Sequence, residues 1–357
     1  MKEPGEPRRR DFTALTGLRF FLALWVILHH LTGPGQKLEA TALLLPHGLF
    51  TLIRGGYQAV TTFFVLSGFV LTRSYAATVW TRRNTLRYAL GRVARVYPVY
   101  LLSLAVVAPF IWVDQTPGKP GYLAAHFLLV QAWLGAIPVN WNTPAWSLSC
   151  EMFFYALFPL SALFTRRAKW RGIALAAAIA CCLTRAMWAV GVSDNIKPLV
   201  HLSDFLMGIA AACAYELLQR RARPPMGWWL YIPGFVGAAG VIAYPEVLPK
   251  FIDLNSALRP LNGVLLIGLA LGGGLLARAL STRLVVYLGK SSYAMYILHV
   301  PILWWCLRQS PEFPPLAYIA IVIAVSAAVY GLFEEPSNRK LRSFLRDPAR
   351  QPAPASP

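Results

Sequence analysis

Several ionisable side chains lie inside long apolar stretches of this sequence. The stretch 12–31 contains Arg19 and ends in His29 and His30. A charged group inside a membrane helix costs a few kcal/mol, so such residues are functional candidates by default. Arg19 and His30 are eleven residues apart, about three helical turns, so both should face the same way, roughly 16 Å apart along the axis. The alternative is that the two side chains extend to opposite membrane interfaces.

Three other apolar stretches carry an acid or a histidine at a depth that would place it on the same side of the membrane as His30. Glu151 lies about one turn inside the fourth stretch, Asp204 lies in the sixth and His299 in the ninth. A carboxylate at this depth needs a partner, and a histidine is a suitable one. The sequence therefore predicts that these three residues share the outer half of the membrane domain with His30. The alternative for each is an interfacial side chain that reaches water alone.

An arginine pair and a serine complete the set of candidates. Arg92 and Arg95 are three residues apart, hence neighbours on one helical face at the cytoplasmic mouth of the third stretch. Two guanidinium groups there would suit a phosphorylated ligand, although plain orienting charge is the alternative. Ser67 precedes Gly68 without a G-x-S-x-G pattern, so we expect it to pack or hydrogen-bond and not to act as a nucleophile.

This layout describes a path across the membrane. A basic mouth would face the cytoplasm, and a cluster of acid and base groups would lie near the far side. A histidine beside a glutamate can abstract a hydroxyl proton and make an acceptor nucleophilic. The arrangement is the one expected if an acyl group moves from a cytosolic phosphorylated carrier to an acceptor outside.

The composition indicates that these groups lie in a membrane protein. Of 357 residues, 57% are hydrophobic and 14% are charged, whereas soluble domains are about half apolar and about a quarter charged. The net charge of +19 comes from short basic clusters between apolar stretches, which favours the positive-inside rule over nucleic-acid binding. The five cysteines include no C-x-x-C pair, so neither a disulfide framework nor a metal site is expected.

The positions of the apolar stretches predict an all-α, polytopic bundle of about ten transmembrane helices. The predicted spans are 12–31, 54–73, 94–113, 146–164, 172–190, 199–218, 227–244, 258–278, 284–306 and 315–333. Every second loop is basic, which predicts that both termini are cytoplasmic. We expect the membrane to be the inner (plasma) membrane. The apolar segment 121–137 lies between prolines and is expected to be re-entrant or interfacial.

The same pattern divides the chain into three parts. Residues 1–11 form a predicted cytoplasmic segment, 12–334 the membrane domain, and 335–357 a cytoplasmic tail that is partly disordered. No polar stretch is long enough for a second domain, so we expect the membrane domain or a partner to handle any acceptor.

Taken in order, the motifs of the chain resemble those of the membrane acyltransferase 3 family. They are Gly17-Leu18-Arg19 with ten residues before His30, FFVLSGF at 63–69, R-x-x-R-x-Y-P at 92–98, P-x-W-S-L-S-x-E-x-F-F-Y at 144–155, S-Y-x-x-Y-x-x-H at 292–299, and Glu334-Glu335-Pro336. The resemblance covers nearly the whole chain, from about 11 to 341. Each motif alone is a weak signal, and their shared order is a strong one.

This resemblance implies ten spans and transfer of an acyl group, usually acetyl from acetyl-CoA, to a hydroxyl of a sugar or another small acceptor. His30 would be the catalytic base, Arg19 would be needed with it, and Glu151 would belong to the active site. The candidate substrate-binding residues are Arg92, Arg95, His299, Ser67, Trp146 and Asp204. No bound cofactor is expected, because acyl-CoA would be a co-substrate. Expected partners are membrane lipid, acyl-CoA and a glycan or other acceptor, without nucleic acid.

One departure and two competing hypotheses remain. Family members often carry an Asp before the FFVLSG run, where this chain has Thr61, which puts a role for an acid there in doubt.

A transporter could use the same intramembrane Arg, His and acidic residues as a substrate and proton path, although the order of the motifs favours an enzyme. A third hypothesis keeps the enzyme but makes the acceptor a small lipophilic metabolite.

Overall fold

The computed structural model describes residues 12–33, 36–111, 119–135, 141–191, 196–220, 227–249 and 252–344. Within these ranges the chain is helical and contains no strand. The predicted segment 1–11 and the tail beyond 344 lie outside the described residues. The all-α prediction is therefore confirmed for the part that the structure describes.

The longer helices are α1 (Thr13–Leu31), α4 (Ala59–Ser74), α5 (Arg82–Ile111), α7 (Trp146–Ala189), α9 (Leu202–Gln219), α10 (Trp228–Ala243), α11 (Leu254–Leu271), α14 (Ser292–Gln309) and α15 (Pro315–Val329). Shorter helices are α2 (Glu39–Leu43), α3 (His47–Arg54), α6 (Lys119–Phe127), α8 (Lys197–Val200), α12 (Gly274–Leu280), α13 (Arg283–Lys290) and α16 (Glu335–Phe344). The turns η1 (Gly55–Gln58), η2 (Gln131–Trp133), η3 (Thr143–Ala145) and η4 (Pro245–Val247) are 3₁₀, and η5 (Tyr330–Glu334) is a π-helix.

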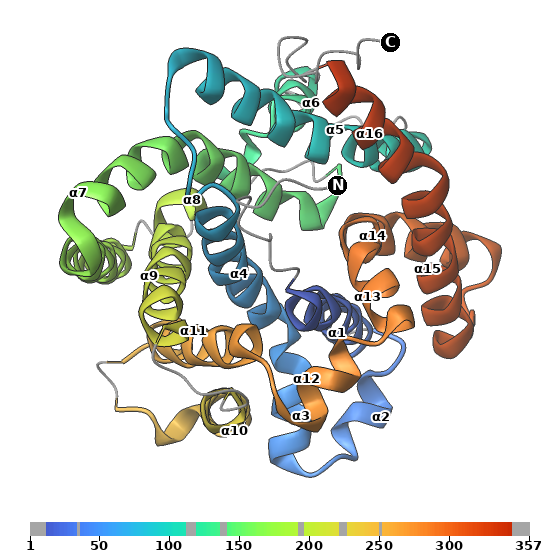
Figure 1. The fold of residues 1–357 in the computed structure, drawn as a ribbon. Coiled ribbons are helices and arrows are strands. Elements are labelled where there is room, and N and C mark those ends of the chain that lie inside the picture. Colours follow the sequence, from blue (N-terminus) through green and yellow to red (C-terminus); the bar gives the residue numbers. More distant parts are fainter. Residues whose placement is uncertain are drawn as a thin grey trace.

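Helix α1 lies in the middle of the bundle (Figure 1) and contacts α3, α4 and α11 to α14. Two glycine contacts hold it close to its neighbours. A Cβ on Gly17 would lie 2.0 Å from the Leu280 carbonyl oxygen, and one on Gly56 would lie 2.2 Å from the Trp25 carbonyl oxygen. Small residues permit such close backbone approach between membrane helices. These contacts fix both ends of α1, and with them the positions of Arg19 and His30.

Helices α4 and α9 also meet through glycines. A Cβ on Gly68 would lie 2.2 Å from the Phe205 carbonyl oxygen, and one on Gly208 would lie 1.9 Å from the Val65 carbonyl oxygen. The Ser67-Gly68 pair therefore lies at a helix crossing of small residues, as expected from the sequence. This crossing brings the start of α9 against the middle of α4.

Helix α7 departs from the predicted pair of separate spans. Helical structure runs without a break from Trp146 to Ala189, through the basic segment expected to form a loop. A straight helix would hold Phe154 and Thr184 about 45 Å apart. Both, however, contact the first turn of α9: Phe154 stacks on Phe205 at 5.0 Å, and the Thr184 hydroxyl lies 3.4 Å from that of Ser203. The helix must therefore bend, as Figure 1 shows, so that both of its halves reach the start of α9.

Six segments of the described chain are long and apolar enough to cross a membrane. They are Thr13–Leu31, His47–Ser74, Arg82–Ile111, Lys197–Gln219, Leu254–Leu271 and Pro315–Leu341. Each overlaps a predicted span, so the chain is a multi-pass membrane protein, although the predicted count of about ten is not reached by this criterion. The other four predicted spans correspond to the two halves of α7, the sixteen-residue α10, and α13 with α14.

Three predicted boundaries were wrong for local reasons. Helix α5 starts at Arg82, about three turns before the predicted span, and continues through Pro98 into its apolar part. Helix α11 ends at Leu271, since Gly272, Gly273 and Gly274 adopt φ values of 81°, 92° and 76°, a region that only glycine enters readily. The span predicted over 284–306 is divided at Ser291. Helix α6 has nine residues and is too short to span, as predicted.

Candidate active site

The imidazoles of His30 and His299 lie against each other. Their ring centroids are 4.9 Å apart with an angle of 62° between the planes. His30 is in the last turn of α1, and His299 is in the middle of α14. The His299 side chain is fully buried and that of His30 is partly exposed. Helices distant in sequence thus bring together two groups that can exchange protons.

Backbone carbonyls fix the tautomer of both rings. Nδ1 of His30 lies 2.9 Å from the Val26 carbonyl oxygen, and Nδ1 of His299 lies 2.6 Å from that of Tyr296. A carbonyl oxygen only accepts, so each Nδ1 carries a proton in a neutral ring and each Nε2 retains its lone pair. Neither Nε2 has a hydrogen-bond partner within the described residues. Both rings therefore present an unshared basic nitrogen.

The surroundings of this pair hold its two helices in register. The Tyr296 hydroxyl lies 2.8 Å from the Ser147 hydroxyl and donates to the Pro144 carbonyl at 3.1 Å. These bonds tie α14 to the start of α7. On the other side, Nδ1 of His29 lies 2.5 Å from the Arg54 carbonyl oxygen, which ties the end of α1 to the end of α3. The positions of the His30 and His299 rings are therefore set by neighbouring elements on both sides.

Glu151 belongs to a second polar cluster. Its Oε1 accepts a hydrogen bond from the Tyr155 hydroxyl, one turn further along α7, and a longer one from the Ser67 hydroxyl at 3.4 Å. Arg19, which is partly buried in α1, interacts electrostatically with Glu151, Tyr155, Arg92 and Arg95. The structure therefore groups Glu151 with the arginines. The sequence had placed Glu151 with His30, because depth estimated from hydropathy does not fix which neighbours a helix face meets.

Arg92 lies among aromatic rings. Its guanidinium carbon is 5.9 Å from the ring centroids of Tyr75 and Tyr88 and 5.6 Å from that of Tyr155. Rings at this distance attract a cation through their quadrupole. Within the described chain Arg92 forms no ion pair, and its Nε is buried without a partner. The guanidinium is therefore positioned by aromatic contacts while its charge is not cancelled by a direct carboxylate.

Arg95 is used differently. It forms an ion pair with Glu334, whose side chain is 1% exposed, and lies 5.5 Å from the Tyr293 ring centroid. Glu334 ends the π-helical turn η5, an irregularity common at functional positions. Both arginines lie within α5, because that helix starts before the predicted span. Tyr155 was missed from the sequence, although its spacing of four from Glu151 was a usable signal.

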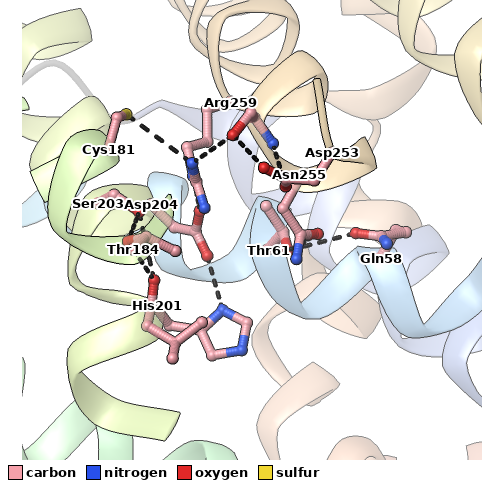
Figure 2. Close-up of polar contacts among 12 residues, drawn as sticks. Gln58, Thr61, Cys181, Thr184, His201, Ser203, Asp204, Asp253, Asn255 and Arg259 are labelled. Atoms are coloured by element: carbon pink, nitrogen blue, oxygen red, sulfur yellow. Dashed lines mark hydrogen bonds and ion pairs between the residues drawn. The ribbon is translucent and has the colours of Figure 1, made fainter. Parts of the chain in front are cut away.

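Asp204 and Trp146 lie apart from the paired histidines. Both oxygens of Asp204 are engaged, one by Arg259 at 2.6 Å and the other by Nδ1 of His201 at 2.7 Å. The predicted role of Asp204 in substrate binding stays a prediction, and the structure shows its side chain fully buried between Arg259 and His201 (Figure 2). The ring centroids of Trp146 and His201 are 5.3 Å apart. The Lys197 ammonium lies over the Trp146 ring, 4.8 Å from its centroid. His201 and Arg259 were not singled out as site residues from the sequence.

Two further observations concern ligands. The described residues contain no group of His, Cys, Asp and Glu side chains that could hold a metal ion. A hollow of about 370 Å³ lies at the opposite end of α1 from His30, between α1, α11 and α12, and is lined by residues such as Phe12, Leu269 and Arg278. The residues that line it include neither His30 and His299 nor Arg19, Arg92 and Arg95.

Comparison with known proteins gives a consistent result. The profile of the acyltransferase domain (acyltransferase 3) matches residues 12–334. The chain is 30% identical to the acyltransferase MdmB of Streptomyces mycarofaciens, over 98% of this chain and 97% of that protein. It is 22% identical to the O-acetyltransferase OatA of Staphylococcus aureus, over 93% of this chain but 58% of that longer protein. No solved structure matches. The chain therefore belongs to the acyltransferase 3 family, as its motifs indicated, and is an O-acetyltransferase-like membrane enzyme.

Proposed function

We propose that the protein transfers an acyl group, most simply acetyl, from acyl-CoA to a hydroxyl of an extracytoplasmic glycan or other acceptor. The observation that carries this proposal is the free Nε2 of His30, fixed by the Val26 carbonyl and adjacent to His299. In the reaction, Nε2 of His30 takes the hydroxyl proton while the acceptor oxygen attacks the thioester carbon. The carbon–sulfur bond then breaks, and the CoA thiolate leaves and takes up the proton.

The second cluster is suited to the donor. CoA carries phosphates, and Arg92 presents a guanidinium whose charge has no direct carboxylate partner among the described residues. Arg19, on the same helix as His30, links the two clusters along about 16 Å of α1. A flexible pantetheine arm could extend between them, with its phosphates at the arginines and its thioester near the imidazoles. We assign Arg92, with Arg19 and Arg95, to donor binding on this basis.

The orientation in the inner membrane follows from the charge pattern. We propose that both termini are cytoplasmic, so that His30 lies toward the outside and the arginines toward the inside. The relative OatA is named an O-acetyltransferase, which supports acetyl as the group transferred to oxygen. Reporter fusions should place 32–53 outside and the segment that follows Arg73 inside, and the reverse result would invert the path.

The direct test uses purified protein in a detergent without hydroxyl groups. With acetyl-labelled acetyl-CoA we expect label transfer to a hydroxylic acceptor and release of CoA. The His30→Ala variant should bind acetyl-CoA but transfer no label. A wild-type protein that neither binds acetyl-CoA nor releases CoA with any acceptor would overturn the proposal and would favour transport.

A further inference from the structure

Pro301 deprives one carbonyl of α14 of its usual helical partner. A carbonyl in an α-helix accepts a hydrogen bond from the N–H four residues later, and proline has no N–H. Pro301 lies inside α14, so the carbonyl of Ile297 loses this bond. Ile297 is fully buried, and a buried carbonyl without a partner costs free energy. A donor from elsewhere is therefore needed two residues before His299.

The donor is the side-chain amide of Asn142, which is itself fully buried. Its Nδ2 donates to the Ile297 carbonyl oxygen at 2.9 Å and to the Ser103 hydroxyl at 3.0 Å. The Ser103 hydroxyl donates in turn to the Tyr100 carbonyl at 2.7 Å, so its oxygen is left to accept. Because a carbonyl oxygen can only accept, these bonds fix the orientation of the amide and use both of its hydrogens. Asn142 thus caps the carbonyl that Pro301 frees.

The capped turn of α14 also holds the His299 imidazole. Nδ1 of His299 lies 2.6 Å from the Tyr296 carbonyl oxygen, which belongs to the peptide just before that of the Ile297 carbonyl. Peptide units are planar, so these two neighbours are joined only through the backbone dihedral angles of Ile297. A change in the direction of the Ile297 carbonyl would therefore also move the carbonyl that holds the ring. The cap and the imidazole are coupled through one residue.

We propose that Asn142 is a positioning residue that keeps the His299 imidazole against that of His30. This inference rests on the proposed function. Asn142 acts through the Ile297 carbonyl and not on the substrate, so it is not a catalytic residue. A displacement of about 1 Å can lower a reaction rate about 10²-fold. Loss of the cap should therefore appear in kcat and not in the binding of acetyl-CoA.

The first test is Asn142→Leu, which keeps the approximate size of the side chain and removes its donors. We expect kcat for label transfer, measured per molecule that binds acetyl-CoA, to fall about 10²-fold, with KM for acetyl-CoA unchanged. The matched control is Asn262→Leu, at a buried asparagine of α11 whose Nδ2 has no partner within the described residues. It should leave kcat unchanged. Ser103→Ala removes only one acceptor of the Asn142 amide and should lower kcat about threefold to tenfold, which keeps the test valid if Asn142→Leu does not fold.

The second test measures the cap without any transfer assay. Pro301→Ala returns a backbone N–H that can bond to the Ile297 carbonyl within the helix. Asn142→Leu should lower the Tm of the detergent-solubilised protein by about 2–4 °C. In the Pro301→Ala background the same substitution should lower it by less than half as much, because the carbonyl has a second donor. Such non-additivity is the signature of two groups that share one partner.

The two measurements separate the possible outcomes. Additive Tm changes would show that Asn142 is not the cap of this carbonyl. A wild-type kcat in Asn142→Leu, or an equal loss in Asn262→Leu, would overturn the positioning role. If the wild type transfers no acetyl group to any acceptor while the Tm changes remain non-additive, the proposed function and the positioning role fail together, but the cap stands.

Discussion

The two polar clusters of the bundle differ in what holds their ionisable groups. One cluster is His30 with His299, and the other is Glu151 with the nearby arginines. His30 and His299 are held by backbone carbonyls, with no ion pair among the described residues. Arg92 is surrounded by aromatic rings, and Arg95 is paired with the buried Glu334. The first cluster contains neutral groups with lone pairs, whereas the second contains fixed charges. One helix, α1, contributes to both.

This difference indicates a division of labour. A neutral imidazole whose Nδ1 is fixed can accept a proton at Nε2 without breaking an ion pair. A guanidinium cannot serve as a base at ordinary pH, but it binds phosphate with defined geometry. On the proposed function, proton transfer and anion binding would be about three turns of α1 apart. Substitutions in the two clusters should accordingly affect different kinetic constants.

The largest effect is expected for His30→Ala. Removing a positioned base lowers rates by about 10²–10⁴-fold, and the loss should appear in kcat. KM for acetyl-CoA should stay near the wild-type value, because the arginines are intact. Label transfer from acetyl-CoA measures this, with His47→Ala as the control for loss of an exposed imidazole. Normal transfer by His30→Ala would remove the distinction between the clusters.

The next largest effect is expected for Arg95→Ala, on stability. It leaves Glu334 buried without its partner, and breaking such a pair costs about 3–5 kcal/mol. We expect a clear fall in the Tm of the detergent-solubilised protein. The double variant Arg95→Ala with Glu334→Gln should recover part of it, since no charge remains unpaired. An unchanged Tm in Arg95→Ala would show that this ion pair contributes little.

The sequence predicted the elements better than it predicted their neighbours. Apolar stretches and basic loops located α1 and α9, and Ser67-Gly68 indicated the close helix crossing. The break at Gly272–Gly274 was missed because hydropathy averages over a window, although three consecutive glycines were visible. The bend of α7 could not be predicted, since it depends on contacts of Phe154 and Thr184 with α9. Tertiary packing decided these points.

The candidate site was predicted in part for the same reason. His30 and His299 do meet, as predicted, whereas the electrostatic interaction of Arg19 with Glu151 was not predicted. The assignment of Glu151 to the histidines differs from the structure, because the rotation of a helix about its axis is set by packing. Roles of these residues remain predictions until the variants are measured. Glu334 was recognised only as part of a motif, and its pairing with Arg95 required the fold.

A smaller effect is expected for Arg92→Ala. A charge-assisted hydrogen bond contributes about 1.5–3 kcal/mol, so KM for acetyl-CoA should rise about tenfold to a hundredfold. The Tm should change less than in Arg95→Ala, because Arg92 leaves no carboxylate unpaired. Arg82→Ala, at the exposed start of the same helix, is the matched control. If Arg82→Ala and Arg92→Ala changed KM for acetyl-CoA equally, both arginines would serve only as positive charge that orients the chain in the membrane.

The smallest effect is expected for Ser67→Ala. The Ser67 hydroxyl lies 3.4 Å from Oε1 of Glu151, at the long end for a hydrogen bond, whereas Tyr155 donates to the same oxygen at close range. Removing Ser67 should cost less than about 1 kcal/mol, which lowers kcat/KM by less than about fivefold. Tyr155→Phe should have the larger effect, because it removes the main donor to Glu151. If Ser67→Ala instead abolished transfer with the protein still folded, the serine would act on the acyl group itself, and the catalytic centre would move from the imidazoles to the cluster around Glu151.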